Sequence, residues 1–203
     1  MFSKILVPLD GSPLAECTLP HAAIFANAFG AKVTLLHVVE CNGSYQGSVP
    51  IDPLEWRVRK AEAQAYLNTQ VERLNEADIE VEGILIEGQP AQRIIEYVRE
   101  TGTDLIIMSS HGKSGVNSWN IGSLVHKIIQ RVHISVLLVR AYQPACENIV
   151  DLHYQRILAP LDGSPRAECV STPGARLAEF MEAELILTHV VAKPPVFQYM
   201  PAE

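Results

Sequence analysis

The sequence predicts an α/β protein whose strands form a parallel sheet. Short apolar runs, each typical of a buried strand, occupy residues 4–9, 32–39, 104–108 and 135–139, and a run at 79–86 that alternates with glutamate predicts a more exposed strand. Patterns with helical spacing separate these runs, and most connections are short. Strands and helices that alternate in this way favour a parallel sheet covered by helices.

Proline and glycine mark where the helices begin and end. The first helix is expected at residues 13–29, where Gly30 ends it, and Pro20 should kink it or move its start to a later residue. A stretch rich in Gly, Ser and Pro at 42–53 predicts a loop. Helical spacing predicts three further helices, at 54–77, 90–101 and 123–133.

Size, charge and cysteine usage exclude several classes of protein. With 203 residues, the chain is expected to hold one domain and part of another. A formal net charge of −7 argues against a general nucleic-acid binder. The N-terminus resembles neither a signal peptide nor a membrane span, so a cytoplasmic protein without a membrane partner is expected. The cysteines form no C-x-x-C pair, which predicts free thiols and no metal centre at Cys17, Cys41, Cys146 and Cys169.

Residues 109–123, SSHGKSGVNSWNIGS, connect a buried strand to the start of a helix. Glycines let the backbone approach a ligand, and the N–H groups of a first helical turn point toward it, so this arrangement is typical of anion binding. Charge supports the same interpretation, because no Asp or Glu lies between Asp104 and Glu147. The interval between these two residues instead contains His111, Lys113, His126, Lys127, Arg131, His133 and Arg140. A capped surface loop is the alternative that the loop alone leaves open.

A second polar strand end is available to pair with this loop. Asp10 and its neighbours Gly11 and Ser12 follow the first strand, as Ser109 follows the fourth. Ligands of parallel sheets bind at the carboxyl ends of strands, where the strand order reverses. If the first and fourth strands are adjacent, both loops therefore face one crevice, which is the candidate site. An Asp in such a turn can also serve only to cap the following helix.

The chain contains an internal repeat at an offset of 152 residues. Residues 157–169, ILAPLDGSPRAEC, copy residues 5–17, ILVPLDGSPLAEC, with two differences. The same offset aligns THVV at 188–191 with LHVV at 36–39, so the copy extends over a strand, a helix and a second strand. The two histidines that this alignment matches are both expected to be core residues: His37 and His189.

The second copy stops early and ends in a proline-rich tail. It has no counterpart of the 109–123 loop, so it cannot form a complete site, and two strands with one helix bury little core of their own. The repeat predicts a first domain at 1–141, a linker at 142–154 and a truncated second copy at 155–203.

Three segments resemble the universal stress protein family: ILVPLDGS near the N-terminus, GQPAQRIIEYV at 88–98, and SSHGKSG, IGS and SVLLV within 109–139. The family's ATP-binding members carry G-x-x-G, a spacer of constant length, and then G-[ST]. The same spacing is present here, from Ser109 and Gly112 through KSGVNSWNI to Gly122-Ser123. Serine replaces the first glycine of the pattern.

The resemblance implies an open parallel five-stranded sheet of order 3-2-1-4-5 with helices on both faces, followed here by a partial second β-α-β unit. It also implies an ATP molecule across the ends of the first and fourth strands, with any Mg²⁺ held by the phosphates. Asp10 would bind the ribose and Val38 the adenine. Gly112, Gly122 and Ser123 would hold the phosphates through backbone N–H groups. The implied contact residues are Pro8, Leu9, Asp10, Val38, Ser109, His111, Gly112, Lys113, Gly122, Ser123, Leu124 and Val125.

Three functions remain open after the resemblance. The first is an adenine-nucleotide-binding stress-response sensor or regulator that is not a fast enzyme, since the sequence shows no recognisable nucleophile–base pair. The second is a slow ATP hydrolase or phosphotransferase, although a Ser-Gly-Gly-x-Asp-Ser pyrophosphate loop is absent from the sequence. The third is a dimeric interaction module that binds no nucleotide. Ser109 and Val125 favour this third function, because nucleotide-binding relatives often carry a hydroxyl residue where Val125 stands.

The resemblance also implies a partner surface. Family members usually dimerise through the fifth strand, which corresponds here to residues 136–139. A tandem copy normally fills that position within one chain. The incomplete second copy therefore leaves two arrangements open, a homodimer and a tandem-repeat pseudo-dimer.

Overall fold

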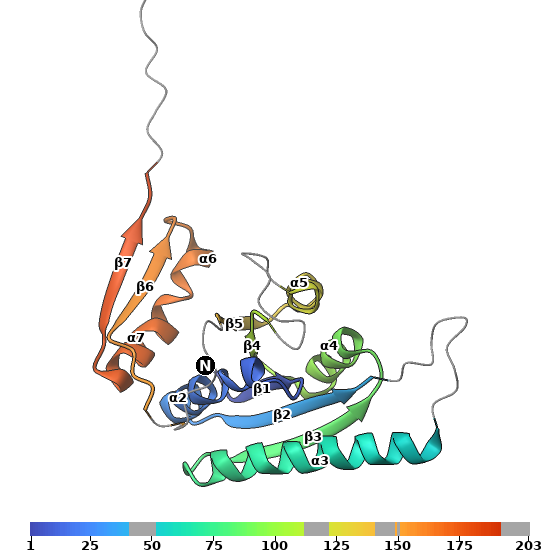
Figure 1. Ribbon diagram of the computed structural model, residues 1–203. Coiled ribbons are helices and arrows are strands. Elements are labelled where there is room, and N and C mark those ends of the chain that lie inside the picture. Colours follow the sequence, from blue (N-terminus) through green and yellow to red (C-terminus); the bar gives the residue numbers. More distant parts are fainter. Residues whose placement is uncertain (41–51, 112–121, 141–148, 150, 192–203) are drawn as a thin grey trace, which may run out of the picture. The chain divides into compact units, whose positions relative to one another are not determined.

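A parallel sheet forms the centre of the computed structural model, which describes residues 1–40, 52–111, 122–140, 149 and 151–191 (Figure 1). The five strands lie in the order β3-β2-β1-β4-β5, and all neighbouring pairs are parallel. The fold class and the strand order expected from the sequence and its family resemblance are confirmed. The strands are β1 (Lys4–Leu9), β2 (Lys32–Val39), β3 (Val81–Glu87), β4 (Leu105–Ser109) and β5 (Ser135–Val139).

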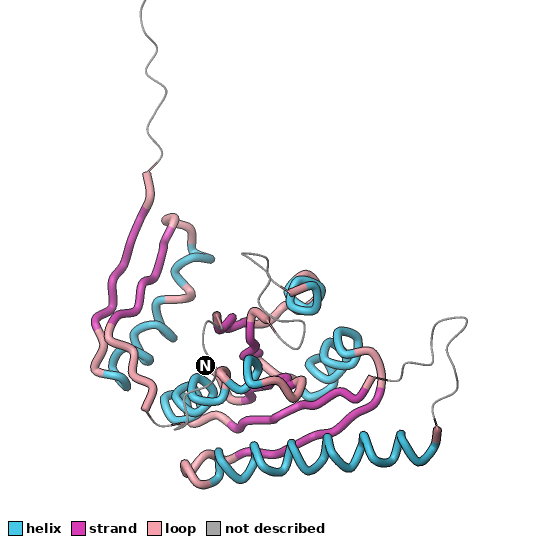
Figure 2. The backbone as a smooth tube through the Cα atoms, viewed as in Figure 1, coloured by secondary structure: helices cyan, strands magenta, loops and turns pink. Residues whose placement is uncertain are grey.

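Helices cover both faces of this sheet (Figure 2). One face carries α4 and α5, whose residues join Leu6, Leu36 and Ile106 in a buried apolar cluster. α3 packs on β2 and β3 from the other side, so closely that a Cβ atom at Gly83 would lie 2.9 Å from the Val71 side chain. The helices are α1 (Pro13–Glu16), α2 (Leu19–Phe29), α3 (Pro53–Asn75), α4 (Pro90–Thr101) and α5 (Ser123–Ile129).

Local hydrogen bonds explain where the helices depart from the prediction. The single helix expected at 13–29 is divided, and α2 begins at Leu19 with Pro20 in its first turn, which is the later start that proline allows. The helix expected at 123–133 already ends at Ile129. The N–H groups of the next residues fold back there, and those of Arg131 and Val132 both donate to the Ile128 carbonyl, at 2.9 and 3.0 Å.

The strand order decides where a ligand can bind. β1 pairs with β2 on one side and with β4 on the other, with Ile5 opposite Leu105 and Leu6 opposite Ile106. The chain therefore leaves β1 in one direction and returns to its other side, so the order reverses between β1 and β4. Loops that follow these two strands meet at the same edge of the sheet. This adjacency is the condition on which the predicted crevice depended.

The chain divides into two units, residues 1–152 and residues 153–203. In the second unit, a two-stranded parallel sheet is accompanied by two helices, and each element begins 152 residues after its counterpart in the first unit. The predicted linker at 142–154 falls largely outside the described residues. That the second unit is a truncated family domain stays a prediction. Its elements are β6 (Arg156–Leu161), α6 (Pro165–Glu168), α7 (Ser171–Met181) and β7 (Glu184–His189).

His21 on α2 is expected to make the fold sensitive to acid. Burial lowers the pKa of its imidazole to about 4, whereas an unfolded histidine titrates near ~6.5. Between these values only the unfolded chain binds the proton, so the free energy of unfolding should fall by up to about 3 kcal/mol as the pH drops through this window. Above the upper value both states are neutral and His21 contributes no pH dependence.

Urea denaturation at several pH values tests this prediction on the native chain and on His21→Gln. The substitution removes the titrating group but keeps a polar side chain. We expect the stability of His21→Gln to decline less than that of the native chain over the same pH range. Parallel declines in the two proteins would contradict the prediction and assign the acid sensitivity to other groups.

Candidate functional site

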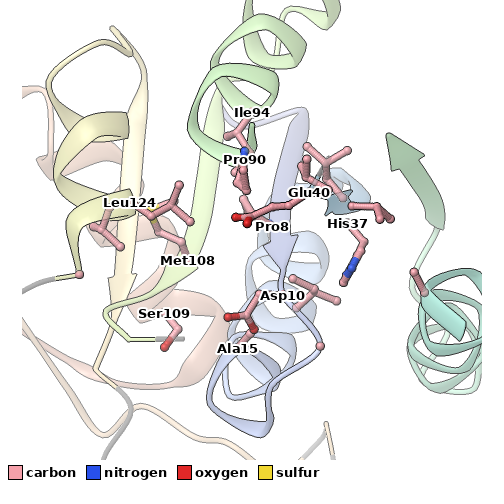
Figure 3. A pocket seen from close by; sticks show the side chains of 18 of the residues that line it. Pro8, Asp10, Ala15, His37, Glu40, Pro90, Ile94, Met108, Ser109 and Leu124 are labelled. Atoms are coloured by element: carbon pink, nitrogen blue, oxygen red, sulfur yellow. The ribbon is translucent and has the colours of Figure 1, made fainter. Parts of the chain in front are cut away.

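A cavity of about 800 Å³ lies at the carboxyl ends of β1, β2 and β4 (Figure 3). α3, the start of α4 and the start of α5 complete its wall. The labelled side chains of Pro8, His37, Met108 and Leu124 show that each of these strands and α5 contributes to it, and Asp10 follows directly after β1. The cavity therefore occupies the edge of the sheet where the strand order reverses, as expected for a ligand site of a parallel sheet.

The cavity brings together residues that are far apart in the sequence. Two of the twelve predicted contact residues, Gly112 and Lys113, lie outside the described residues. The other ten all line the cavity: Pro8, Leu9, Asp10, Val38, Ser109, His111, Gly122, Ser123, Leu124 and Val125. The geometry thus gathers these ten residues at one place.

A tight turn holds Asp10 at the edge of the cavity. Its Oδ1 atom accepts hydrogen bonds from the Ser12 backbone N–H at 2.9 Å and from the Ser12 hydroxyl at 2.6 Å. Gly11 between them has a φ of 78°, a conformation that glycine adopts without strain. Ser12, and not Asp10, caps α1, because its hydroxyl oxygen accepts from the Ala15 N–H at 3.2 Å. Asp10 therefore does not cap the helix itself, as the alternative interpretation of the sequence had it. It instead orients Ser12, the residue that does.

Three described backbone N–H groups between β4 and α5 donate within the protein. The N–H of Ser110 donates to the Val139 carbonyl at 2.8 Å, and that of Gly122 donates to the Ser110 carbonyl at 3.1 Å. The N–H of His111 donates to the Ser109 hydroxyl at 3.3 Å. Helix geometry leaves the N–H groups of the first α5 turn without intrahelical acceptors. Among the described residues on this side of the cavity, these groups, at Ser123 and the two residues after it, are the backbone donors still available.

His111 is held by its neighbour. Its Nδ1 atom lies 2.9 Å from the Ser110 hydroxyl, while its buried Nε2 atom has no hydrogen-bond partner among the described residues. A serine beside a histidine is a nucleophile–base contact that the sequence did not reveal, because adjacent residues rarely face one another. A catalytic triad also needs a third group that orients the imidazole of the base. No described group bonds to Nε2 of His111 to serve in this way.

Known proteins resemble the first unit of this chain in sequence. A sequence model of the universal stress protein family matches residues 1–140. The chain belongs to this family. One relative, universal stress protein YxiE of Bacillus subtilis, is 34% identical over 149 residues, which covers 69% of this chain and 100% of the relative.

Solved structures share the universal stress protein fold. The structure of MJ0577, a protein of Methanocaldococcus jannaschii, has a TM-score of 0.61 and 28% identity, and the match covers 70% of this chain and 99% of that one. A universal stress protein from Archaeoglobus fulgidus, described as a complex with dAMP, has a TM-score of 0.51 and 20% identity over 68% of this chain and 97% of that one. At this lower identity the likeness shows the fold alone.

Helix α3 supplies further cavity residues that are not part of the universal stress protein motif. The wall contains four residues from successive turns of this helix: Arg59, Glu62, Ala63 and Tyr66. The ring of Tyr66 packs edge-on against His37 of β2, with 5.9 Å between the ring centroids. Sequence analysis missed these residues, because the helical pattern of α3 does not show which of its faces meets the end of β2.

Charge is distributed unevenly around the cavity. The carboxylates of Asp10, Glu40 and Glu62 line it, and Arg59 is the only lysine or arginine among the described lining residues. Arg59 is itself paired with Glu55 at 2.5 Å. The described groups on the α3 side therefore disfavour a bound anion, and an anionic part of a ligand would sit better beside β4 and α5.

The described residues contain neither a candidate metal site nor a candidate membrane span. The described residues contain no cluster of three or more His, Cys, Asp or Glu side chains that could hold a metal ion. Among the helices that the structure describes, none combines the length and the apolar character needed to cross a membrane.

Proposed function

We propose that this universal stress protein binds an adenine nucleotide in the cavity and acts as a sensor or regulator in a stress response. One observation carries the proposal: Asp10, Val38 and the start of α5 converge on one cavity at the reversal of strand order. Adenine-nucleotide binding is also what the Archaeoglobus fulgidus relative is described as doing with dAMP. Catalysis is not part of the proposal, and hydrolysis of bound ATP is expected to be slow at most.

The two sides of the cavity suit the two halves of a nucleotide. Apolar side chains of Val38, Ile94 and Met108 offer a surface for the base. Asp10 offers a carboxylate acceptor to ribose hydroxyls. The first turn of α5 offers backbone donors to phosphate oxygens, and any Mg²⁺ would be held mainly by those phosphates.

Copurification and titration test the proposal. Protein purified without added nucleotide is denatured, and the supernatant is analysed for adenine nucleotides. Apo protein is then titrated calorimetrically with AMP, ADP and ATP, and with GTP as a control for the base. We expect binding of at least one adenine nucleotide with a dissociation constant below ~1 mM and weaker binding of GTP. Absence of copurified nucleotide together with no measurable binding in the millimolar range would overturn the proposal.

Ser109→Gly is expected to raise the affinity for a phosphate-bearing nucleotide by roughly three- to tenfold. The Ser109 hydroxyl now accepts the His111 N–H, and removing that hydroxyl frees a donor on the wall of the cavity. Ser109→Ala is the matched control, because it removes the same acceptor but keeps a Cβ atom. Calorimetric titration should show gains in both variants, larger for glycine if the side-chain volume also hinders the phosphates. Unchanged or weaker binding in both would show that this N–H does not reach the ligand.

A second candidate function has its own support. The N–H groups of Ser110, His111 and Gly122 are satisfied internally, and Val125 is buried, as expected for a site that has lost its phosphates. We would then expect an interaction module that pairs through the edge strand β5, with a second chain or with a tandem copy as its partner. The titration above distinguishes the two candidates. Sedimentation of the native chain and of a variant with a charge at Val136 tests the β5 interface.

A further inference from the structure

Glu40 carries an exposed carboxylate that lines the cavity and that a ligand can reach. Among the described residues, none forms a hydrogen bond or an ion pair with it. Two basic side chains of the flanking helices are already paired with other carboxylates, Lys60 of α3 with Glu87 and Arg93 of α4 with Glu96. A carboxylate is a strong hydrogen-bond acceptor, so Glu40 is available to a donor group of a ligand.

The side chain of Glu40 lies on the same face of the sheet as the apolar wall of the cavity. Successive side chains of a strand point to opposite faces, so Leu36, Val38 and Glu40 share one face at the end of β2. Leu36 belongs to the buried cluster under α4 and α5, and Val38 packs against that cluster. Figure 3 shows the Glu40 side chain directed toward Pro90, at the start of α4. The carboxylate therefore lies next to the apolar surface proposed to hold the base.

A carboxylate at this place can discriminate between purine bases. The 6-amino group of adenine donates hydrogen bonds, which a carboxylate accepts. The 6-oxo group of hypoxanthine and of guanine is an acceptor, and two acceptors in contact repel one another. A site built to bind a donor rejects the analogue that lacks it, because a polar group of the protein is then left without a partner.

The start of α4 offers Glu40 a structural role as an alternative. A negative charge beside the N-terminus of a helix is favourable, and Pro90 is the first residue of α4. In that role the carboxylate would stabilise the folded chain and would have no influence on the choice of base. The two roles therefore differ in whether a substitution of Glu40 changes base preference or stability.

We propose that the Glu40 carboxylate accepts a hydrogen bond from the 6-amino group of the bound base and so makes the site selective for adenine over 6-oxopurine nucleotides. The inference rests on the proposed function, since it needs a nucleotide in the cavity. It adds a specificity-determining residue at the end of β2, outside the loop between β4 and α5.

Ligand and protein are varied together to test this inference. The ligands differ at and beside position 6 of the purine: AMP, IMP, and purine riboside 5′-monophosphate, which has no substituent there. Each is titrated calorimetrically into the native chain, Glu40→Gln and Glu87→Gln. Glutamine keeps the size of glutamate, but its amide can donate as well as accept. Glu87→Gln is a matched control, because Glu87 lies opposite Val39 at the same edge of the sheet but does not line the cavity.

In the native chain, AMP should bind at least roughly tenfold more tightly than IMP and purine riboside 5′-monophosphate. In Glu40→Gln the ratio of the affinities for AMP and IMP should fall by roughly tenfold, because the amide can turn its N–H group toward the 6-oxo group. Glu87→Gln should keep the native ratio. Thermal unfolding without ligand should leave the midpoint of Glu40→Gln within about 2 °C of the native value, since the residue is exposed.

An AMP-to-IMP ratio that is the same in Glu40→Gln and in the native chain would overturn the inference. If the midpoint of unfolding also fell, Glu40 would be assigned to the start of α4. A ratio lowered equally by Glu87→Gln would attribute the preference to the charge of this edge and not to a hydrogen bond with Glu40. If the native chain binds none of the three nucleotides, the proposed function fails and the inference fails with it, an outcome distinct from the others.

Discussion

Leu6→Ala is expected to lower the free energy of unfolding of residues 1–152 by about 2–5 kcal/mol. Leu6 lies in β1 and is fully buried, with 0% of its surface exposed. It belongs to the cluster that fixes α4 and α5 to the sheet, together with Leu36 and Ile106. Shortening it leaves a cavity between the sheet and both helices, and the lost contacts add to the lost burial.

The internal repeat provides a matched control for this substitution. Leu158 occupies the position of Leu6 in the copied segment, in the same kind of parallel pair of strands, but it is 61% exposed. Leu158→Ala should therefore change stability by less than about 0.5 kcal/mol.

Tryptophan fluorescence during urea denaturation reports on the first unit, because both tryptophans, Trp56 and Trp119, belong to residues 1–152. Leu6→Ala should shift the fluorescence midpoint to a lower urea concentration, whereas Leu158→Ala should leave it in place. Similar losses in both variants would contradict the burial that separates the two positions.

The elements of the sheet could be predicted because their signals are local. Apolar runs between proline and glycine are visible without any tertiary information, and each strand of the first unit was found within about two residues. The order of the strands, in contrast, depends on pairing between residues that are far apart in the sequence. Ile5 pairs with Leu105, and such a pairing leaves no mark in the residues around either position. Only the family resemblance supplied the order, and through it the crevice.

His37 and His189 show how tertiary context limits the sequence. They stand at matching positions of the repeat, and both were expected in a core. His37 is buried against Tyr66 of α3. For His189 the prediction is wrong, because it is exposed and its Nδ1 atom lies 2.8 Å from the Leu161 carbonyl oxygen. The described part of the second unit has no helix in the place of α3, so the same residue meets solvent.

The candidate site was predicted where it depends on a motif and missed where it depends on packing. The motif residues that the structure describes all line the cavity, since loops after adjacent parallel strands must meet. Tyr66 was missed, because only the docking of α3 brings it to the end of β2. The bond between the Ser109 hydroxyl and the His111 N–H was missed as well, because it depends on how one side chain is oriented.

Gly122→Val is expected to reduce the affinity for ATP by more than about 100-fold, which corresponds to about 2.7 kcal/mol. Gly122 precedes α5 and lines the cavity beside the N–H groups proposed to hold the phosphates. A Cβ atom there would meet only one described atom within 4 Å, the Ser110 carbonyl oxygen at 3.4 Å. The methyl groups of valine would therefore occupy space that the phosphates need.

Folding should survive the same substitution. The backbone of Gly122 has a φ of −54° and a ψ of 145°, a conformation that valine adopts readily. Its N–H would still be able to donate to the Ser110 carbonyl, as it does now at 3.1 Å. We therefore expect a change in the free energy of unfolding of less than about 1 kcal/mol. Denaturation of Gly122→Val in the absence of nucleotide measures this change.

Gly122→Ala is an intermediate variant between the native chain and Gly122→Val. Alanine adds the Cβ atom without the two methyl groups, so its affinity for ATP should lie between those of the native chain and Gly122→Val. A graded loss with unchanged stability would identify close approach of the backbone to the ligand as the reason for glycine at this position. If Gly122→Val instead binds ATP as the native chain does, the phosphates do not pass Gly122, and the nucleotide cannot lie between Asp10 and the start of α5.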